Sequence, residues 1–245
     1  MKTIGLLGGM SWESTELYYR YINEGIKQKL GGLHSAQIVL VSVDFQAIEE
    51  LQHKGDWEQA GKVLTTAAQQ IEAAGADFLL ICTNTMHKVA PQIEQGIQIP
   101  ILHLADATAE KIRQNGLKTV GLLGTNFTME QDFYKGRLRD RHGLTVVVPS
   151  AEDRQTVHRI IYDELCRGIV KESSRQQYLS IMDQMQADGA EGIIEGCTEI
   201  AILVQQQHTP IPLFDTTTIH AEAAVEKALA FTPPTPPAPS HLPPK

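Results

Sequence analysis

Short apolar runs alternate with longer amphipathic stretches along most of this chain. The apolar runs predict buried strands, and stretches with apolar residues three or four apart predict helices. The predicted strands span residues 2–8, 36–43, 97–102, 118–124, 144–148 and 211–215, with two more ending at Cys82 and Cys197. The predicted helices span residues 11–30, 57–74, 106–115, 128–141, 156–168, 176–187 and 218–231. This alternation predicts an α/β fold with two doubly wound parallel sheets.

The pattern repeats itself halfway along the chain. Residues 118–126 match residues 2–10 at six of nine positions, at a constant offset of 116, and Cys82 and Cys197 are 115 residues apart. We interpret this as an internal duplication that gives two similar halves related by a pseudo-twofold axis. Because ligands bind at the carboxyl ends of parallel strands, both cysteines are predicted to face one cleft between the halves.

Residues 232–245 differ in composition from the rest of the chain. They contain seven of its 12 prolines, and proline has no backbone N–H to donate to regular structure. The segment is therefore predicted to be an extended, disordered tail. A functionless extension is favoured over a ligand for a proline-binding partner.

The overall charge and the start of the chain exclude several classes of protein. The formal net charge of -8 over 245 residues gives no attraction toward nucleic acid or an anionic membrane, so neither is expected as a partner. Met1–Leu7 is predicted to be a strand, not a targeting or membrane segment, so the cytoplasm is the expected location. The three cysteines are then expected to be free thiols. No C-x-x-C or H-E-x-x-H spacing occurs, so no metal site is expected.

Cys82 and Cys197 are the candidate catalytic residues. Each follows an apolar run and precedes a threonine, at a predicted helix start whose N–H groups would favour a thiolate and bind a carboxylate. Thiols on opposite faces of one carbon are what stereochemical inversion requires. A single buried cysteine at a strand end is more often a packing residue, but two in matching repeats favour catalysis. Cys166 has no repeat partner and is interpreted as packing or pocket lining.

Other polar motifs are weaker. Residues 5–9 do not fit G-x-G-x-x-G and no Walker lysine follows a glycine turn, which disfavours nucleotide binding. His103 with Asp106, and His220 with Glu222, are interpreted as helix-end or surface polar groups instead of acid/base pairs.

Four segments carry a family resemblance: Ile4–Met10, Cys82–Thr85, Gly121–Thr125 and Gly196–Glu199. With them, residues 1 to about 230 resemble the aspartate/glutamate racemase superfamily, and within it the broad-specificity amino-acid racemases of enteric bacteria. The resemblance implies proton transfer between two thiols on a small amino-acid substrate, without pyridoxal phosphate or another cofactor, and a homodimer. It implies a discontinuous first half, 1–103 plus 217–231, and a second half, 104–216. It also implies a substrate pocket lined by Met10, Ser11, Gln52, Thr83, Asn84, Thr85, Thr125, Asn126 and Thr198.

Two departures from the family pattern concern substrate range. By the same resemblance, relatives restricted to acidic substrates carry an arginine in the loop after the second strand. They also carry a lysine in the helix near position 166. This chain has Ile-Glu-Glu-Leu-Gln at residues 48–52 and a cysteine at position 166. A broad range of neutral or mixed substrates is therefore predicted. The alternatives are an aspartate/glutamate-selective racemase, a hydantoin or dicarboxylate isomerase of the same superfamily, and a non-catalytic amino-acid sensor.

Overall fold

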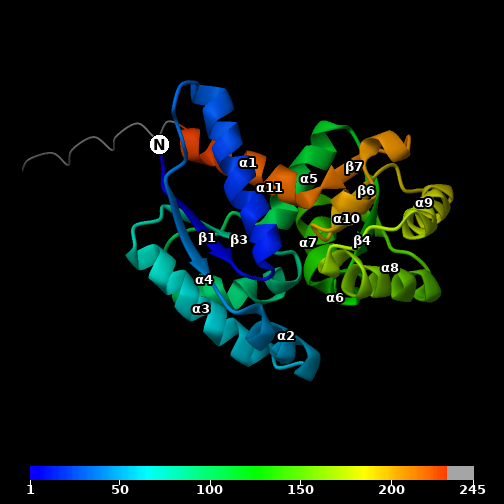
Figure 1. Ribbon diagram of the computed structural model, residues 1–245, viewed down its shortest axis with the longest axis horizontal. Helices are drawn as coiled ribbons and strands as arrows, with labels where there is room; N and C mark the ends of the chain where they lie inside the picture. Colours follow the sequence, from blue (N-terminus) through cyan, green and yellow to red (C-terminus); the bar gives the residue numbers. More distant parts are fainter. Residues whose placement is uncertain (231–245) are drawn as a thin grey trace, which may run out of the picture.

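Two parallel β-sheets form the framework of the protein (Figure 1). The computed structural model describes residues 1–230, so the predicted tail lies outside the described residues. The first sheet has the order β2-β1-β3, formed by Ile38–Ser42, Ile4–Gly8 and Phe78–Ile81. The second has the order β5-β4-β6-β7, formed by Thr145–Val147, Thr119–Gly124, Ile193–Gly196 and Leu213–Asp215. Every pairing is parallel, which confirms the predicted fold class.

Helices connect and cover these strands. The α-helices are α1 (Trp12–Leu30), α2 (Phe45–Lys54), α3 (Trp57–Ala73), α4 (Ala90–Gly96), α5 (Leu104–Gln114), α6 (Asn126–Glu130), α7 (Asp132–His142), α8 (Ala151–Asp163), α9 (Glu172–Ala187), α10 (Ile200–Leu203) and α11 (Thr216–Leu229). Three short 3₁₀ helices are η1 (Thr85–Val89), η2 (Leu165–Arg167) and η3 (Gln206–His208).

Several elements differ from the sequence prediction. The predicted helix 128–141 is divided into α6 and α7, and the predicted helix 156–168 lies five residues earlier as α8. Helix α2 was not predicted, although Asp44 caps its start and the left-handed Gly55 ends it. The predicted strand 97–102 joins the first sheet only through a bridge between Leu79 and Ile101. Pro100 supplies a carbonyl to Leu79 but has no N–H to extend the ladder, which explains why pairing stops there.

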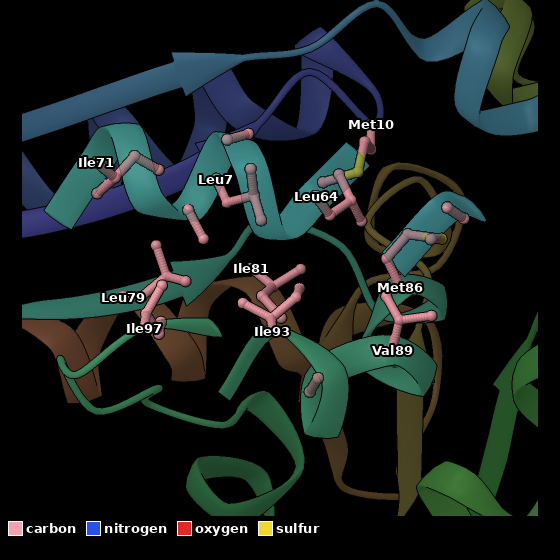
Figure 2. Packing of buried hydrophobic residues seen from close by; sticks show 14 of the residues in the cluster. Leu7, Met10, Leu64, Ile71, Leu79, Ile81, Met86, Val89, Ile93 and Ile97 are labelled. Atoms are coloured by element: carbon pink, nitrogen blue, oxygen red, sulfur yellow. The ribbon is translucent and has the colours of Figure 1, made fainter. Parts of the chain in front are cut away.

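The strands of the first sheet send alternate side chains to two separate cores. On one face, Leu7, Leu79 and Ile81 pack against Leu64 and Ile71 of α3, as Figure 2 shows. On the other face, a second cluster packs against α1 and α11; its strand residues are Ile4, Leu6, Phe78, Leu80 and, just beyond β3, Cys82. The alternation therefore places the Cys82 thiol on the face covered by α1 and α11.

Helix α11 returns from the second sheet to the first. It lies beside α1 in Figure 1, and its Ala224 and Val225 belong to the same core cluster as Ile22 of α1. Gly25 permits this close approach, because a Cβ at that position would lie 2.9 Å from Cγ2 of Val225. The division into 1–103 plus 217–231 and 104–216 stays a prediction. Within residues 1–230, no helix combines the length and the apolar character that a membrane crossing requires.

Candidate active site

A cavity of about 620 Å³ is lined by the segments that directly follow β1, β3, β4 and β6. It therefore lies at the carboxyl ends of both sheets, where parallel α/β folds bind ligands. Most residues of the predicted site line it: Met10, Ser11, Gln52, Thr83, Asn84, Thr85, Thr125, Cys197 and Thr198. The fold thus brings side chains from distant parts of the sequence to one place.

Cys82 and Asn126 are the two predicted site residues that do not line this cavity. The Cys82 side chain is fully buried in the core beneath α1 and α11. Asn126 is the first residue of α6, and its backbone N–H donates to Nδ1 of His158 at 3.2 Å. Its side-chain Oδ1 is buried and has no hydrogen-bond partner within residues 1–230.

The Cys82 thiol lies in an apolar environment, and its backbone is held firmly. The N–H of Cys82 donates to the carbonyl of Leu7 at 2.9 Å, and Oγ of Ser14 donates to the Cys82 carbonyl at 3.1 Å. Burial raises the pKa of the thiol far above its ordinary value, because a thiolate there would lose its hydration. Cys82 is accordingly a protonated thiol at neutral pH.

The Cys197 thiol has an acidic partner. Its Sγ donates to Oε2 of Glu199 at 2.9 Å, and both residues line the cavity. Burial is the main cause that raises the pKa of Cys197, and the negative charge of Glu199 raises it further. Glu199 belongs to the segment Gly196–Glu199, which carries part of the family resemblance. Its hydrogen bond to the thiol was not predicted from the sequence.

Stabilisation of the thiolates by the following backbone is smaller than the effect of burial, although a backbone hydrogen bond from Glu199 does lower the pKa of Cys197. The element after Cys82 is η1, a five-residue 3₁₀ helix, and the element after Cys197 is α10, with four residues. Helix α10 has few aligned peptide dipoles and little positive potential at its start, whereas η1 continues directly into α4. Desolvation is consequently the larger effect at both thiols.

A chain of hydroxyl groups joins the two cysteine segments. Ser14 uses its proton for the Cys82 carbonyl, so in its 3.0 Å contact with Oγ1 of Thr198 it must be the acceptor. Thr198 then accepts from Thr217 at 3.1 Å. The direction of donation is fixed as Thr217 to Thr198 to Ser14 to the Cys82 carbonyl. The Thr198 hydroxyl proton is thus already used within the protein.

Asn84 presents an unpaired acceptor. Its Nδ2 donates to Oγ1 of Thr216 at 3.1 Å, and Thr216 in turn donates to the carbonyl of Glu195 at 2.9 Å. This fixes the orientation of the Asn84 amide. Its Oδ1 is buried and has no hydrogen-bond partner within residues 1–230, although the residue lines the cavity. A buried acceptor without a partner is costly, so this oxygen favours a ligand that donates to it.

The remaining wall of the cavity combines apolar and charged side chains. Arg167, at the end of η2, is its one cationic residue within the described part of the chain, and Glu13 and Glu199 are acidic. The sequence prediction located no cation because it considered residues 48–52 and position 166, and Arg167 is the next residue. Cys166 also lines the cavity; the residue is exposed overall, but partial desolvation of its thiol, followed by the charges of Glu199 and Glu13, raises its pKa to about 12.

The two histidines of the sequence analysis have structural roles. His103 caps the start of α5 by accepting from the N–H of Ala105 at 3.2 Å, as a helix-end group. His220 is fully buried, so its interpretation as a surface group is wrong. Its Nε2 donates to the carbonyl of Leu102 at 2.7 Å, and Nδ1 accepts from the Tyr18 hydroxyl at 2.9 Å. Burial, with a smaller contribution from His87, lowers the pKa of His220 to about 3.

Comparison with known families agrees with this geometry. The family model described as Asp/Glu/hydantoin racemase matches residues 7–224. The chain belongs to this family. The resemblance stated from its motifs is thereby confirmed, and membership supports a racemase activity.

Individual members of the family are similar along almost their whole length. The broad specificity amino-acid racemase RacX of Bacillus subtilis (strain 168) is 23% identical over 237 residues, covering 93% of this chain and 99% of RacX. A crystal structure from Yersinia pestis, assigned to the Asp/Glu racemases, is 55% identical, covers 94% of this chain and 100% of its own, and superposes with a TM-score of 0.90. An aspartate racemase homologue from Pyrococcus horikoshii OT3 is 34% identical, with 93% and 99% coverage and a TM-score of 0.82.

Proposed function

We propose that this protein is a pyridoxal-phosphate-independent racemase that inverts the α-carbon of amino acids through Cys82 and Cys197. One observation carries the proposal. The residues that directly follow both thiols line the same cavity, and the hydroxyl of Ser14 links the two segments. Family membership supports the reaction class, and the arrangement of the duplicated segments supports the two-thiol form of it.

The hydrogen bond between Cys197 and Glu199 suggests how a thiolate forms. Transfer of the thiol proton to Glu199 leaves a Cys197 thiolate, which removes the α-proton of the substrate. The Cys82 thiol, which is buried beside the cavity in this structure, must then become exposed to the substrate, and it gives its proton to the opposite face of the carbanion. The cycle closes when the proton on Glu199 leaves and Cys82 regains one, so no proton is gained or lost overall. The other enantiomer follows the reverse sequence.

The cavity offers complementary groups for the two ends of an α-amino acid. Oδ1 of Asn84 is a free acceptor for the substrate ammonium group. The Thr198 hydroxyl is used within the protein, but the Thr198 backbone N–H meets no acceptor within residues 1–230 and is a donor for the substrate carboxylate. Such donors also stabilise the negative charge that develops on the carboxylate as the α-proton leaves, by up to about 3 kcal/mol each.

The lining of the cavity supports a broad substrate range. Its walls include Trp12, Phe45 and Ile202, which accommodate apolar side chains. Arg167 and Glu13 offer one charge of each sign for polar side chains. A related protein, RacX, is described as having broad specificity, which agrees with this mixed lining.

The first test is deuterium incorporation at the α-carbon in D₂O. The unmodified protein should label both enantiomers of its substrates, whereas Cys82→Ser and Cys197→Ser should lower the exchange rate at least about a thousandfold, since an alcohol is a far poorer acid at this position. Cys166→Ser, the third-thiol control, should keep exchanging. Full exchange by both variants would exclude the two-thiol mechanism. Substrate binding without any exchange by the unmodified protein would indicate an amino-acid sensor.

Arg167 favours one alternative, selectivity for aspartate or glutamate. If the substrate range is broad, Arg167→Gln should lower kcat/KM for acidic substrates about tenfold or more, because these substrates lose an ion pair. The kcat/KM for neutral substrates should stay nearly unchanged. An enzyme restricted to acidic substrates would show no turnover of neutral amino acids before or after the substitution. Hydantoins and dicarboxylates, assayed in parallel, test the remaining isomerase alternative.

A further inference from the structure

A second cavity of about 210 Å³ lies between the two halves of the molecule. One wall comes from η1 and α4 through His87 and Glu94, and the other from α7 through Arg137 and Arg141. His103, directly before α5, also lines it. This cavity shares no lining residue with the larger one, and the proposed function assigns it no role.

His103 directs an unpaired donor into this space. Its side chain is 4% exposed, and Nδ1 accepts from the backbone N–H of Ala105. In the neutral ring the proton must therefore be on Nε2. That atom has no hydrogen-bond partner within residues 1–230, and the cavity is where a partner can reach it. This N–H is therefore available to an acceptor that enters the cavity.

Two guanidinium groups border the same space. Arg137 binds both carboxylate oxygens of Asp106 through Nε and Nη2, at 2.7 and 2.6 Å, which leaves the two N–H groups of Nη1 available. Arg141 is exposed and forms no ion pair within the described residues. Two carboxylates also line the cavity, but Asp140 is already paired with Arg139 at 2.7 Å, so Glu94 is the one acidic group left to oppose an anion.

We propose that this second cavity binds a small oxyanion, a carboxylate or phosphate group, held by His103 Nε2 and the guanidinium groups of Arg137 and Arg141. The volume suits a group of that size. Charge-assisted hydrogen bonds from planar guanidinium groups match the paired oxygens of such anions. The bound oxygen supplies the acceptor that His103 lacks.

The second cavity is connected to the first through η1. The ring of His87 lies with its centroid 4.5 Å from that of His103, and Nδ1 of His87 donates to the carbonyl of Thr83 at 2.8 Å. Thr83 follows Cys82 and lines the larger cavity. Because η1 carries Thr85 in one cavity and His87 in the other, an anion that shifts η1 changes the position of substrate-facing groups.

The test measures binding of inorganic phosphate and of acetate to the unmodified protein. Chloride at equal ionic strength is the control. The cation of Lys88 lies 3.8 Å from the ring centre of Trp57, so the fluorescence of Trp57 reports on this region, best in a Trp12→Phe background. We expect a saturable fluorescence change and a rise in melting temperature with one or both oxyanions but not with chloride. Comparing phosphate with acetate identifies which oxyanion is preferred.

Arg141→Gln is the principal variant, because this side chain is exposed and forms no ion pair within the described residues. It should weaken the apparent affinity about tenfold or more. His103→Asn keeps a residue that caps α5 but withdraws the imidazole N–H, and should weaken binding similarly. Arg113→Gln, an equal charge change on an exposed face of α5 outside both cavities, should bind as the unmodified protein does.

The proposal is overturned if neither oxyanion gives a saturable response, or if Arg141→Gln and Arg113→Gln bind alike. General stabilisation by excluded salts is not saturable and would be equal in all variants, so it is distinguishable. A change in deuterium exchange on adding phosphate would show coupling to the larger cavity. That last measurement rests on the proposed function, whereas the fluorescence and melting measurements do not.

Discussion

Glu195 places a carboxyl group inside the second sheet, two residues before Cys197. It is 3% exposed, and its Oε1 has no hydrogen-bond partner within residues 1–230. Burial, followed by the negative charge of Asp215, raises the pKa of Glu195 to about 8. The folded protein therefore keeps a proton on this carboxyl group at pH 7, whereas the unfolded chain releases it above about pH 4.5.

Replacing Glu195 should change how stability depends on pH. The unfolded state binds fewer protons than the folded state between about pH 4.5 and 8, so this group lowers the free energy of unfolding as pH rises through that range. Glu195→Gln removes the titration and should raise the free energy of unfolding at pH 8 by about 2 to 4 kcal/mol. Below pH 4.5 the variant and the parent should be equally stable.

Thermal melts at pH 4.5 and pH 8 measure this difference directly. Asp188→Asn, on an exposed turn, provides a carboxyl control that should leave both melting temperatures nearly unchanged. A Glu195→Gln variant whose advantage over the parent is the same at both pH values would show that Glu195 is ionised in the folded protein.

At the level of residues, the sequence predicted where the thiols lie but not their ionisation. An apolar run that ends at a cysteine marks a strand end, and the strand period decides which face the thiol joins. Desolvation depends on what covers that face. For Cys82 the covering elements are α1 and α11, and α11 begins more than 130 residues later in the sequence, so no local pattern around Cys82 reveals it.

Four elements meet at the hydroxyl chain. Its hydroxyls come from α1, from the turn after β6 and from α11, and it ends at a carbonyl after β3; Ser14 and Thr198 each both donate and accept. Ser14 is the central link. Replacing it leaves the Thr198 proton without its acceptor and the Cys82 carbonyl without its donor, both in a buried setting.

Ser14→Ala should therefore lower the free energy of unfolding by about 1 to 3 kcal/mol. It should also slow α-proton exchange in both directions, because both cysteine segments lose a common support. Denaturant unfolding and exchange in D₂O measure the two effects. Ser173→Ala, an exposed hydroxyl on α9, is the matched control. If the free energy of unfolding of Ser14→Ala stays within about 0.5 kcal/mol of the parent value, the chain of hydroxyls contributes little to the stability of the fold.

The periodic elements were predictable because their patterns are local. The long helices α1, α3 and α9 follow the apolar spacing closely, whereas α2 is half exposed and was missed despite its capping residues. The segment 97–102 has the apolar composition of a strand, but whether it pairs depends on the neighbouring strand β3, which bonds it at one position only. Pairing is a property of two segments, so one segment alone does not predict it.

For the whole molecule, the duplication predicted two similar sheets, and they are present. What it did not predict is their unequal size, with three strands in the first and four in the second. The additional strand β7 pairs with β6 and leads directly into α11. The second sheet is therefore completed at Asp215, immediately before the chain returns to the first.

A chain that ends at residue 215 should keep the second sheet but lose the cover of the first. Without α11, the cluster that includes Ile4, Leu6 and Tyr18 loses the packing of Ala221, Ala224 and Val225. We expect the truncated chain to bind a hydrophobic dye and to be cut by protease first within residues 1–103. Equal resistance of both halves would show that α11 is dispensable for the first core.

The path of α11 also sets an order of events during synthesis. The strands of the first sheet leave the ribosome before those of the second, yet the helix that closes the second face of the first sheet follows the last strand of the second sheet. The first sheet can therefore be covered only after the second sheet has been synthesised, so the nascent chain carries an open apolar face throughout synthesis of β4 to β7. Chaperone capture of ribosome-bound chains should accordingly persist until residues 216–229 emerge.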